Sequence, residues 1–254
     1  MSGAWYDLSA KRALVVGASR GLGRATALAL AAAGADVDCA ARDAATLEAT
    51  CAAIRALGRT SAAFPLDVAD APALRAAVQA AGSGQLDILV YAAGLMHAEP
   101  ALTLQAAEWD RCLAVNLTGA LVAAQTAGQQ MKAQGRGRIV MFSSAFVDCV
   151  LPYTTAYGAS KAGLQQLVIS LALEWARYGI TVNAVAPGYF ATDMPRAVLD
   201  DSELRQRVLT RIPLRRVGEP DEIGPLVIYL ASDASAFMTG AVLTIDGGQS
   251  LNVS

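Results

Sequence analysis

Short apolar runs alternate with longer stretches of helical periodicity along almost the whole chain. Mostly apolar runs with the length of buried strands occur at 12–16, 36–41, 60–66, 87–92, 138–142, 180–186 and 242–245. Between them, stretches rich in Ala and Leu predict helices at 23–33, 44–57, 71–81, 104–134 with a break near Asn116, 157–178 and 220–230. This alternation predicts βαβ units and a parallel sheet.

No tract rich in Pro, Gly or Ser and no run of charge divides the 254 residues. The sequence therefore predicts a single α/β domain over 1–254, a doubly wound Rossmann domain with a seven-stranded parallel sheet flanked by helices. The stretch from Pro187-Gly188 to Arg216 lacks a clear period, and we expect it to be irregular.

Composition narrows the functional classes. Apolar residues make up 54% of the chain and charged residues 17%, which indicates a compact globular protein. A net charge of −2 without a basic cluster excludes a nucleic-acid-binding surface. The start has no signal-peptide pattern and no apolar run is long enough to span a membrane, so we expect a cytoplasmic protein. Four cysteines without paired spacing and a single histidine predict free thiols and no metal site.

A glycine-rich turn follows the first predicted strand and opens the first predicted helix. Gly17, Gly21 and Gly23 would let the backbone approach a pyrophosphate, whose charge would face the N–H groups of the helix N-terminus. The spacing is Gly-x-x-x-Gly-x-Gly, and such a turn can also be only a tight connection. Its place directly after the first strand favours a dinucleotide site.

Residues at the end of the second predicted strand indicate which dinucleotide is bound. Ala41 stands where a carboxylate would bond the ribose hydroxyls, and Arg42 follows it. Arg20, inside the glycine turn, could reach the same place. We therefore predict NADP(H), with Asp38 or Asp43 as the acidic partner of the alternative, NAD(H).

Tyr157 and Lys161 are four residues apart, so on a helix they share one face. A neighbouring ammonium favours the phenolate, so a tyrosine placed this way could exchange a proton near neutral pH. Ser144 would supply a hydroxyl from the preceding loop. Such a pair alone is also common without any function.

Together these residues resemble the short-chain dehydrogenase/reductase family, and the resemblance covers essentially the whole chain. The motifs that carry it are Gly17-x-x-x-Gly21-x-Gly23, Asp67, Ala93-Gly94, Asn116, Ser144, Tyr157-x-x-x-Lys161, Pro187-Gly188 and Asp246-Gly-Gly. One departure is Tyr91-Ala92, where the family usually has two asparagines. This departure puts a local hydrogen bond near the fourth strand in doubt.

The resemblance implies an NADP(H)-dependent oxidoreductase with Tyr157 as acid/base. In that scheme Ser144 hydrogen-bonds the substrate oxygen, Lys161 lowers the pKa of Tyr157 and holds the nicotinamide ribose, and Asn116 holds a water. The implied catalytic residues are Asn116, Ser144, Tyr157 and Lys161. The implied cofactor-binding residues are Gly17, Ser19, Arg20, Gly21, Leu22, Gly23, Arg42, Asp67, Val68, Ala93, Gly94, Tyr157, Lys161, Pro187, Gly188, Phe190 and Thr192. Asp67 could instead only cap a turn.

By the same analogy, three loops and a covering segment at about 189–216 should form the substrate pocket. Its expected lining is Met96, His97, Phe146, Cys149, Leu151, Tyr153, Tyr189 and Met194. This mostly apolar set predicts a ketone or secondary alcohol with a hydrophobic flank. A sugar acid would need a cation, which only Arg196 or a protonated His97 could offer. The chain also resembles the branch of gluconate 5-dehydrogenases and 3-oxoacyl-ACP reductases, whose substrates are the alternatives.

The sequence is less consistent with two other classes of function, a serine hydrolase and a non-catalytic scaffold. A serine hydrolase would need a histidine base near Ser144 and a nucleophile-elbow motif, and this sequence shows neither. A non-catalytic dinucleotide-sensing scaffold would tolerate loss of Tyr157 or Lys161, yet both are present. We expect the protein to be a homo-oligomer, a tetramer as in many family members, that acts on a small molecule.

Overall fold

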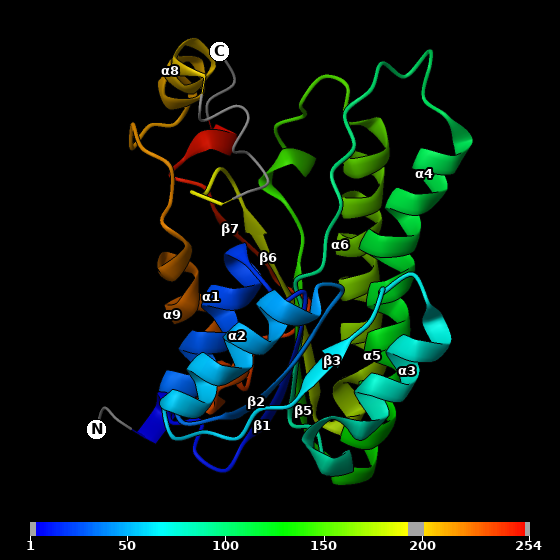
Figure 1. Ribbon diagram of the computed structural model, residues 1–254, viewed down its shortest axis with the longest axis vertical. Coiled ribbons are helices and arrows are strands. Elements are labelled where there is room, and N and C mark those ends of the chain that lie inside the picture. The colour runs from blue at the N-terminus through cyan, green and yellow to red at the C-terminus, as the bar shows by residue number, and fades with distance from the viewer. Residues whose placement is uncertain (1–3, 193–200, 252–254) are drawn as a thin grey trace.

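The computed structural model describes residues 4–192 and 201–251, and its centre is one parallel sheet (Figure 1). The strands are β1(Arg12–Val16), β2(Asp36–Ala41), β3(Ala63–Pro65), β4(Ile88–Tyr91), β5(Gly137–Phe142), β6(Ile180–Pro187) and β7(Val242–Ile245). Their order is β3-β2-β1-β4-β5-β6-β7, and every pairing is parallel. The order reverses between β1 and β4, which is where an open α/β sheet binds its ligand. The predicted seven-stranded Rossmann sheet is thus confirmed.

Helices cover both faces of this sheet (Figure 1). On one face lie α1(Gly21–Ala32), α2(Ala44–Ala56) and α9(Gly224–Ala231). On the other lie α3(Ala71–Ala80), α5(Gly119–Gln134) and α6(Thr155–Trp175), with α4(Ala106–Leu113) preceding α5. None of the described helices has both the length and the apolar character needed to cross a membrane.

Alternation along the strands fills two separate cores. In β1, Val15 packs toward α1 and α9, whereas Leu14 and Val16 pack toward α3 and α5. Both sets are fully buried. A strand covered on both faces reads as a continuous apolar run, and for this reason the run at 12–16 was recognisable without a period of two.

The long helical region predicted at 104–134 is three elements. A π-helical turn at Ala114–Thr118 separates α4 from α5. The predicted break near Asn116 is therefore correct, but the helix begins at Ala106 rather than at 104. The third strand is also shorter than the predicted run 60–66, because only Ala63–Pro65 pair with β2.

The segment expected to be irregular up to Arg216 contains a helix, α8(Ser202–Arg211). Asp201 caps its first turn by accepting hydrogen bonds from Glu203 N and Leu204 N, both at 2.9 Å. Val208 is its one buried residue, so the helix presents no apolar face for a sequence pattern to detect. In Figure 1 α8 lies beyond the carboxyl ends of the strands, on the side where the ligand site is expected.

Candidate active site

The glycine turn between β1 and α1 is packed too tightly for side chains. Gly17 has φ +93°, and a Cβ there would lie 2.5 Å from Ala93 N. At Gly23 a Cβ would lie 2.1 Å from the carbonyl oxygen of Gly17. Gly21 has φ +55° and faces the Thr192 side chain, which a Cβ would meet at 3.4 Å. The turn, the end of β4 and the segment after β6 therefore come together at the N-terminus of α1, as a pyrophosphate site requires.

At the end of β2 the two candidate carboxylates are already in use. Asp38 accepts hydrogen bonds from Ala62 N at 2.8 Å and from Gly82 N at 2.9 Å. Asp43 caps α2 through Thr46 N at 2.8 Å. These bonds give both carboxylates structural roles and weigh against either as the partner of a ribose hydroxyl.

Two guanidinium groups lie beside these carboxylates. Arg42 and Arg20 are both exposed. Hydrogen bonds from Thr46 lower the pKa of Asp43, and the charge of Arg20 lowers it further, which places Arg20 near the end of β2. Two guanidinium groups thus lie near the end of β2, where they could contact a 2′-phosphate.

Asp67 is exposed, and its carboxylate accepts a hydrogen bond from Ala69 N at 3.0 Å. It thus caps a turn, which is the structural alternative to a role in cofactor binding. The neighbouring Val68 is buried. Ser19, Leu22 and Ala93 are half-buried around the glycine turn.

The helix α6 places Tyr157 and Lys161 on one face, both almost fully buried. Lys161 Nζ donates to the carbonyl oxygen of Phe142 at 2.6 Å and lies 5.9 Å from the centre of the Tyr157 ring. Ser144 precedes a short 3-10 turn, Ala145–Val147, and its hydroxyl accepts from Phe146 N at 3.2 Å. The same hydroxyl hydrogen-bonds Tyr157. Strand β5, its following loop and α6 thus bring three predicted catalytic residues together.

One electrostatic expectation is wrong for this arrangement. Burial raises the pKa of Tyr157, and only the hydrogen bond with Ser144 opposes the shift. Burial also lowers the pKa of Lys161 to about 8. The ammonium is directed at the Phe142 carbonyl rather than at the phenol, so burial outweighs the expected lowering of the pKa of Tyr157 by the cation.

Asn116 is the fully buried centre of the π-helical turn. Its Oδ1 accepts from Leu95 N at 2.7 Å, and its Nδ2 donates to Leu95 O at 2.9 Å and to Ser160 Oγ at 2.8 Å. Ser160 Oγ in turn donates to the Tyr157 carbonyl at 2.7 Å. Asn116 therefore ties the loop after Gly94 to the turn of α6 that carries Tyr157. A Cβ on Gly94 would lie 3.6 Å from Lys161 Nζ, so this loop closes directly over the lysine.

Tyr91 replaces one of the amides that the family usually carries. It is fully buried, and its hydroxyl donates to Val115 O at 2.6 Å inside the π-helical turn. Its oxygen lies so near Gly119 that a Cβ there would approach it to 2.3 Å. The phenol thus joins β4 to the π-helical turn. This hydrogen bond takes the place of the one near the fourth strand that the loss of the asparagines put in doubt.

An apolar cluster surrounds Tyr157. Phe146 packs edge-on against Tyr189 with ring centres 5.1 Å apart. Of the predicted pocket residues, the cluster includes Met96, Phe146, Cys149, Leu151 and Tyr189. It also contains Leu104, Trp109 and Cys112, which the sequence analysis did not name. Trp109 and Cys112 are one helical turn apart on α4. The sequence pattern could not identify them as pocket residues because it does not show that α4 packs against Tyr157.

Three pocket predictions have other outcomes. Tyr153 has φ +66° and is 63% exposed, so it lies at the mouth rather than in the cluster. Met194 lies outside the described residues, as does Arg196. His97 is held between two carboxylates, Glu99 and Glu108.

The segment after β6 lies at the same edge of the sheet. Gly188 N donates to Ile245 O at 3.0 Å, and a Cβ on Gly188 would lie 2.6 Å from that of Asp246. Pro187 and Phe190 are buried. Because the Phe190 ring packs on Gly218, any contact that this residue makes with a cofactor comes mainly from its backbone.

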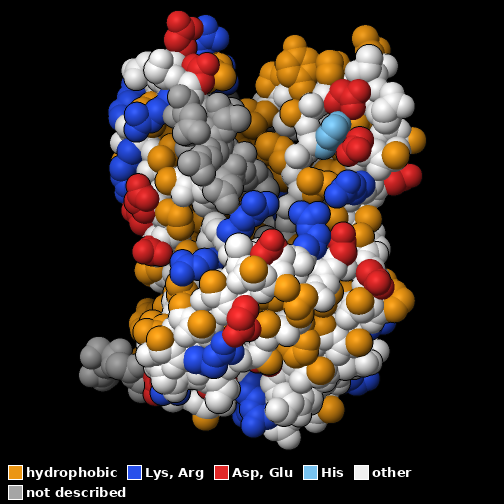
Figure 2. Space-filling model, viewed as in Figure 1, with side chains coloured by type: hydrophobic (Ala, Val, Ile, Leu, Met, Phe, Trp, Pro, Cys, Tyr) orange, Lys and Arg blue, Asp and Glu red, His pale blue; other side chains and the backbone are white. Residues whose placement is uncertain are grey.

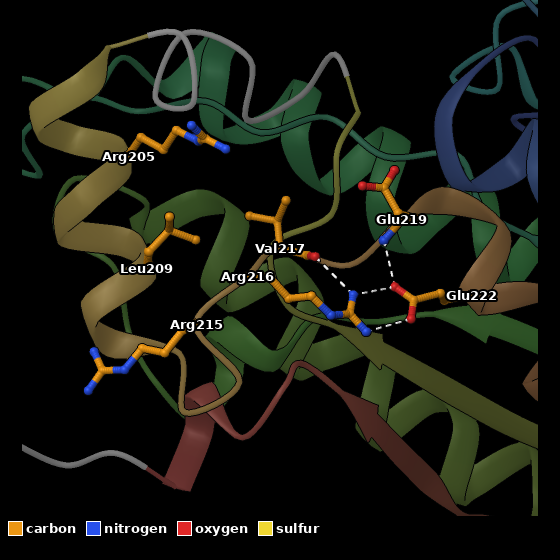
Figure 3. Close-up of a pocket in the computed structure, with 7 residues that line it drawn as sticks. All are labelled: Arg205, Leu209, Arg215, Arg216, Val217, Glu219 and Glu222. Atoms are coloured by element: carbon orange, nitrogen blue, oxygen red, sulfur yellow. Dashed lines mark hydrogen bonds and ion pairs between the residues drawn. The ribbon is translucent and has the colours of Figure 1, made fainter.

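Two hollows on the described surface lie outside the Tyr157 cluster. One, of about 310 Å³, borders the glycine turn through Gly21 and Thr192. The other, of about 560 Å³, lies between α8 and the segment that follows it (Figure 3). There Arg216 and Glu222 form a two-pronged ion pair. None of the predicted catalytic residues lines this second hollow. The described residues contain no cluster of metal ligands.

Comparison with known proteins gives the same family as the residues. A family model described as enoyl-(acyl carrier protein) reductase matches residues 17–250. Over 246 residues the chain is 37% identical to 2-dehydro-3-deoxy-D-gluconate 5-dehydrogenase of Bacillus subtilis, with 96% of each chain covered. Over 241 residues it is 40% identical to 3-oxoacyl-[acyl-carrier-protein] reductase FabG of Staphylococcus aureus, covering 94% of this chain and 97% of that protein.

A solved structure agrees over the full length. A gluconate 5-dehydrogenase from Burkholderia cenocepacia, crystallised in complex with NADP and tartrate, superimposes with a TM-score of 0.95 at 34% identity and 100% coverage of both chains. The chain therefore belongs to the short-chain dehydrogenase/reductase family of oxidoreductases acting on CH–OH and C=O groups.

Proposed function

We propose that the protein is an NADP(H)-dependent oxidoreductase that interconverts a ketone and a secondary alcohol, with Tyr157 as the acid/base. The observation that carries the proposal is the junction of Tyr157, Ser144 and Lys161 at the carboxyl edge of the sheet. This junction lies beside the glycine turn on one side and the Phe146–Tyr189 cluster on the other.

The residues present fit a phosphorylated dinucleotide. Gly17, Gly21 and Gly23 leave room for a pyrophosphate at the start of α1, and Arg20 and Arg42 suit a 2′-phosphate. The NADP complex of the Burkholderia relative supports the same choice. When bound, the cofactor supplies or accepts the hydride.

The protein's own residues move and hold the proton. The Tyr157 hydroxyl gives its proton to the carbonyl oxygen in reduction and takes it back in oxidation. The raised pKa keeps this phenol protonated and ready to donate. Ser144 steadies the same oxygen, and Lys161, 5.9 Å from the centre of the Tyr157 ring, adds positive charge near the phenolate when it is protonated.

An apolar flank is the proposed feature of the substrate. Met96, Leu151 and Tyr189 line the cluster around Tyr157, and Leu102, Val150 and Tyr153 are exposed apolar side chains on the neighbouring loops. Orange side chains gather at the top of the right lobe in Figure 2, beside the hollowed centre of this face.

A sugar acid or a 3-oxoacyl thioester is the second candidate substrate. Relatives with these activities by name are 37% and 40% identical to this chain. One observation also favours an acid: burial raises the pKa of Tyr189, and the charge of Arg211 opposes the shift, so a cation lies near the pocket wall. Arg211 lies on α8, which no sequence pattern predicted.

Assembly and location are further parts of the proposal. Ile169, Leu173 and Phe237 are exposed apolar side chains that a homotetramer could bury. The free thiols of all four cysteines support a reducing, cytoplasmic location. Light scattering at micromolar concentration should give a mass of about four chains, and a monomer would contradict the assembly.

The test is an initial-rate assay with NADPH and NADH in parallel on aryl ketones, cyclic ketones, 3-oxoesters and keto-sugar acids. We expect turnover of apolar ketones with NADPH preferred. Arg42→Ala should reduce that preference by at least about tenfold, since it removes one charge-assisted phosphate contact. Clear preference for 5-ketogluconate would contradict the apolar flank, and preference for NADH would contradict the role of Arg42.

A further inference from the structure

The only histidine of the chain lies between two glutamates next to the apolar cluster around Tyr157. His97 Nε2 is 3.0 Å from Glu99 Oε2, and His97 Nδ1 is 3.6 Å from Glu108 Oε2. In Figure 2 the pale-blue histidine lies between red side chains beside the hollowed centre. We name these three residues the acidic rim.

The chain neighbours of the acidic rim are part of the pocket wall. Met96 precedes His97, Trp109 follows Glu108, and both pack on the apolar cluster of Tyr157. The backbone N–H of Glu99 donates to Tyr153 O at 2.7 Å, which joins the rim to the loop before α6. The rim is thus fixed to the substrate pocket by packing at two points and by one hydrogen bond.

The acidic rim is negative in either protonation state of the imidazole. Two carboxylates and a charged imidazole sum to −1, and with a neutral imidazole the sum is −2. The side chains of His97, Glu99 and Glu108 are 29%, 25% and 39% exposed, so their field reaches an entering ligand. His97 therefore cannot serve as the free cation that a sugar acid would need.

Other carboxylates add to this field at the opposite wall. Burial raises the pKa of Cys149 in the apolar cluster, and the charges of Asp246 and Asp148 raise it further. Among the described residues, Lys161 and Arg211 are cations near the pocket, and exposed Arg111 lies one helical turn after Glu108 on α4. Lys161 is fully buried, so the side chains that meet an entering substrate first are the partly exposed ones of the acidic rim.

We propose that the acidic rim makes the enzyme select neutral or cationic carbonyl substrates and reject those with a carboxylate on the flank that faces α4. This inference rests on the proposed ketone reductase function and specifies its substrate class. In this proposal Glu99 and Glu108 discriminate between substrates by their charge, and His97 holds both carboxylates in place.

The experiment uses three ketones of matched shape, with a neutral, a carboxylate or an ammonium substituent at the same ring position. For each, kcat/KM is measured with NADPH in the wild type, Glu108→Gln and Glu99→Gln. We expect the kcat/KM of the wild type to be about tenfold lower for the carboxylate ketone than for the neutral one. In each variant this difference, the gap between the two ketones, should be about threefold smaller. Added salt should narrow the gap as well.

Glu174→Gln is the matched control, because Glu174 is exposed near the end of α6, remote from Tyr157, and loses the same charge. It should leave the gap unchanged. Melting temperatures of the variants confirm that they are folded, and Glu108→Gln, whose contact with His97 is the longer, is the milder change.

Distinct results overturn the inference. A wild type that uses the carboxylate ketone as well as the neutral one, or a gap unchanged in both glutamate variants, overturns it while the ketone reductase function remains. A preference for the carboxylate ketone that disappears in Arg211→Met assigns recognition to Arg211 instead. Tight NADPH binding without turnover of any ketone removes the proposed function, and the inference with it.

Discussion

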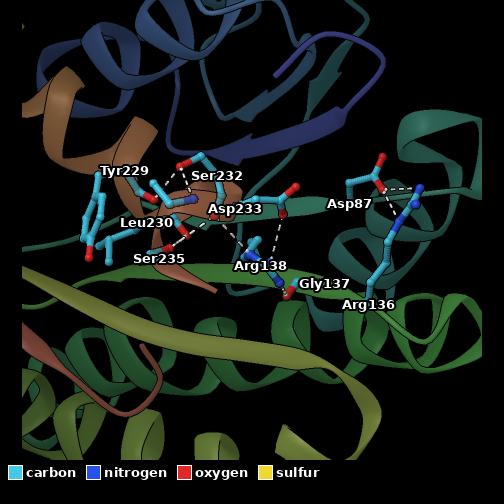
Figure 4. A network of polar contacts seen from close by, with 10 residues as sticks. Asp87, Arg136, Gly137, Arg138, Tyr229, Leu230, Ser232, Asp233 and Ser235 are labelled. Atoms are coloured by element: carbon cyan, nitrogen blue, oxygen red, sulfur yellow. Dashed lines mark hydrogen bonds and ion pairs between the residues drawn. The ribbon is translucent and has the colours of Figure 1, made fainter. Parts of the chain in front are cut away.

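The two ends of the parallel sheet bury charged groups in opposite ways. At the amino ends of the strands, Asp87 is nearly buried and accepts hydrogen bonds from Arg12 N at 3.0 Å and from Arg136 Nε at 3.1 Å (Figure 4). At the carboxyl ends, Lys161 is also buried, but within the part of the chain that the structure describes its ammonium donates to a neutral group, the carbonyl oxygen of Phe142. Paired charges at one end stabilise the fold, whereas a buried amine with only a neutral partner costs stability and has a shifted pKa.

The difference separates residues that hold the sheet together from residues that act. A group whose charge is compensated has little reason to change its protonation state. The pKa of Lys161, lowered by burial to about 8, lies in the range where such a change is possible. The comparison therefore predicts large effects on activity at one end and effects on stability alone at the other.

Tyr157→Phe should give the largest effect. Loss of the phenolic proton should lower kcat about 10³-fold, within the usual range for a general acid, while the dissociation constant for NADPH changes less than about threefold. Stopped-flow rates and cofactor fluorescence titration measure the two quantities. Tyr153→Phe, an exposed tyrosine nearby, is the control and should retain activity. A fall in kcat of less than tenfold would contradict the acid/base role.

Lys161→Met should change how stability depends on pH. Between pH 8 and about 10.5 the unfolded chain still holds a proton on Lys161 that the folded chain has lost. Raising the pH through this window should therefore increase the free energy of unfolding of the wild type, by on the order of 3 kcal/mol in total, and below pH 8 the penalty is constant. The variant lacks this contribution. Urea unfolding at several pH values measures it, and parallel profiles for the two proteins would contradict the burial argument.

Asp87→Ala tests the amino end of the sheet. It removes the acceptor of Arg12 N and the partner of Arg136, and should lower the free energy of unfolding by about 2 kcal/mol. Because Arg136 is 61% exposed, water can hydrate its guanidinium group in the variant, which limits the loss of stability. Urea unfolding measures the change, and kcat/KM should stay within twofold of the wild type. A loss of activity in a folded variant would show that the two ends are coupled.

The sequence predicted the sheet well because β1, β4, β5 and β6 are almost entirely buried and form mostly apolar runs. It did not predict α8, since one buried residue, Val208, gives no period. It brought Tyr157, Lys161 and Ser144 together through local spacing and family motifs. It could not show that α4 places Trp109 against Tyr157, or that Glu99 and Glu108 hold His97, because those contacts depend on how the loop after β4 folds back.

The smallest expected effect concerns Asp233, which pairs with Arg138 at 3.1 Å at the amino end (Figure 4). The Asp233 side chain is 68% exposed, so water and salt screen the pair, and Asp233→Asn should lower the free energy of unfolding by at most about 0.5 kcal/mol.

Arg138 is 15% exposed and also donates to the Ser232 carbonyl at 3.4 Å and to the Gly137 carbonyl at 3.1 Å. Arg138→Met should therefore cost more than Asp233→Asn, about 1 kcal/mol, as two buried carbonyl contacts are lost. Urea unfolding of both variants at low and high salt separates the contributions. Equal losses from the two changes would show that the ion pair, rather than burial of the carbonyl contacts, stabilises this end of the sheet.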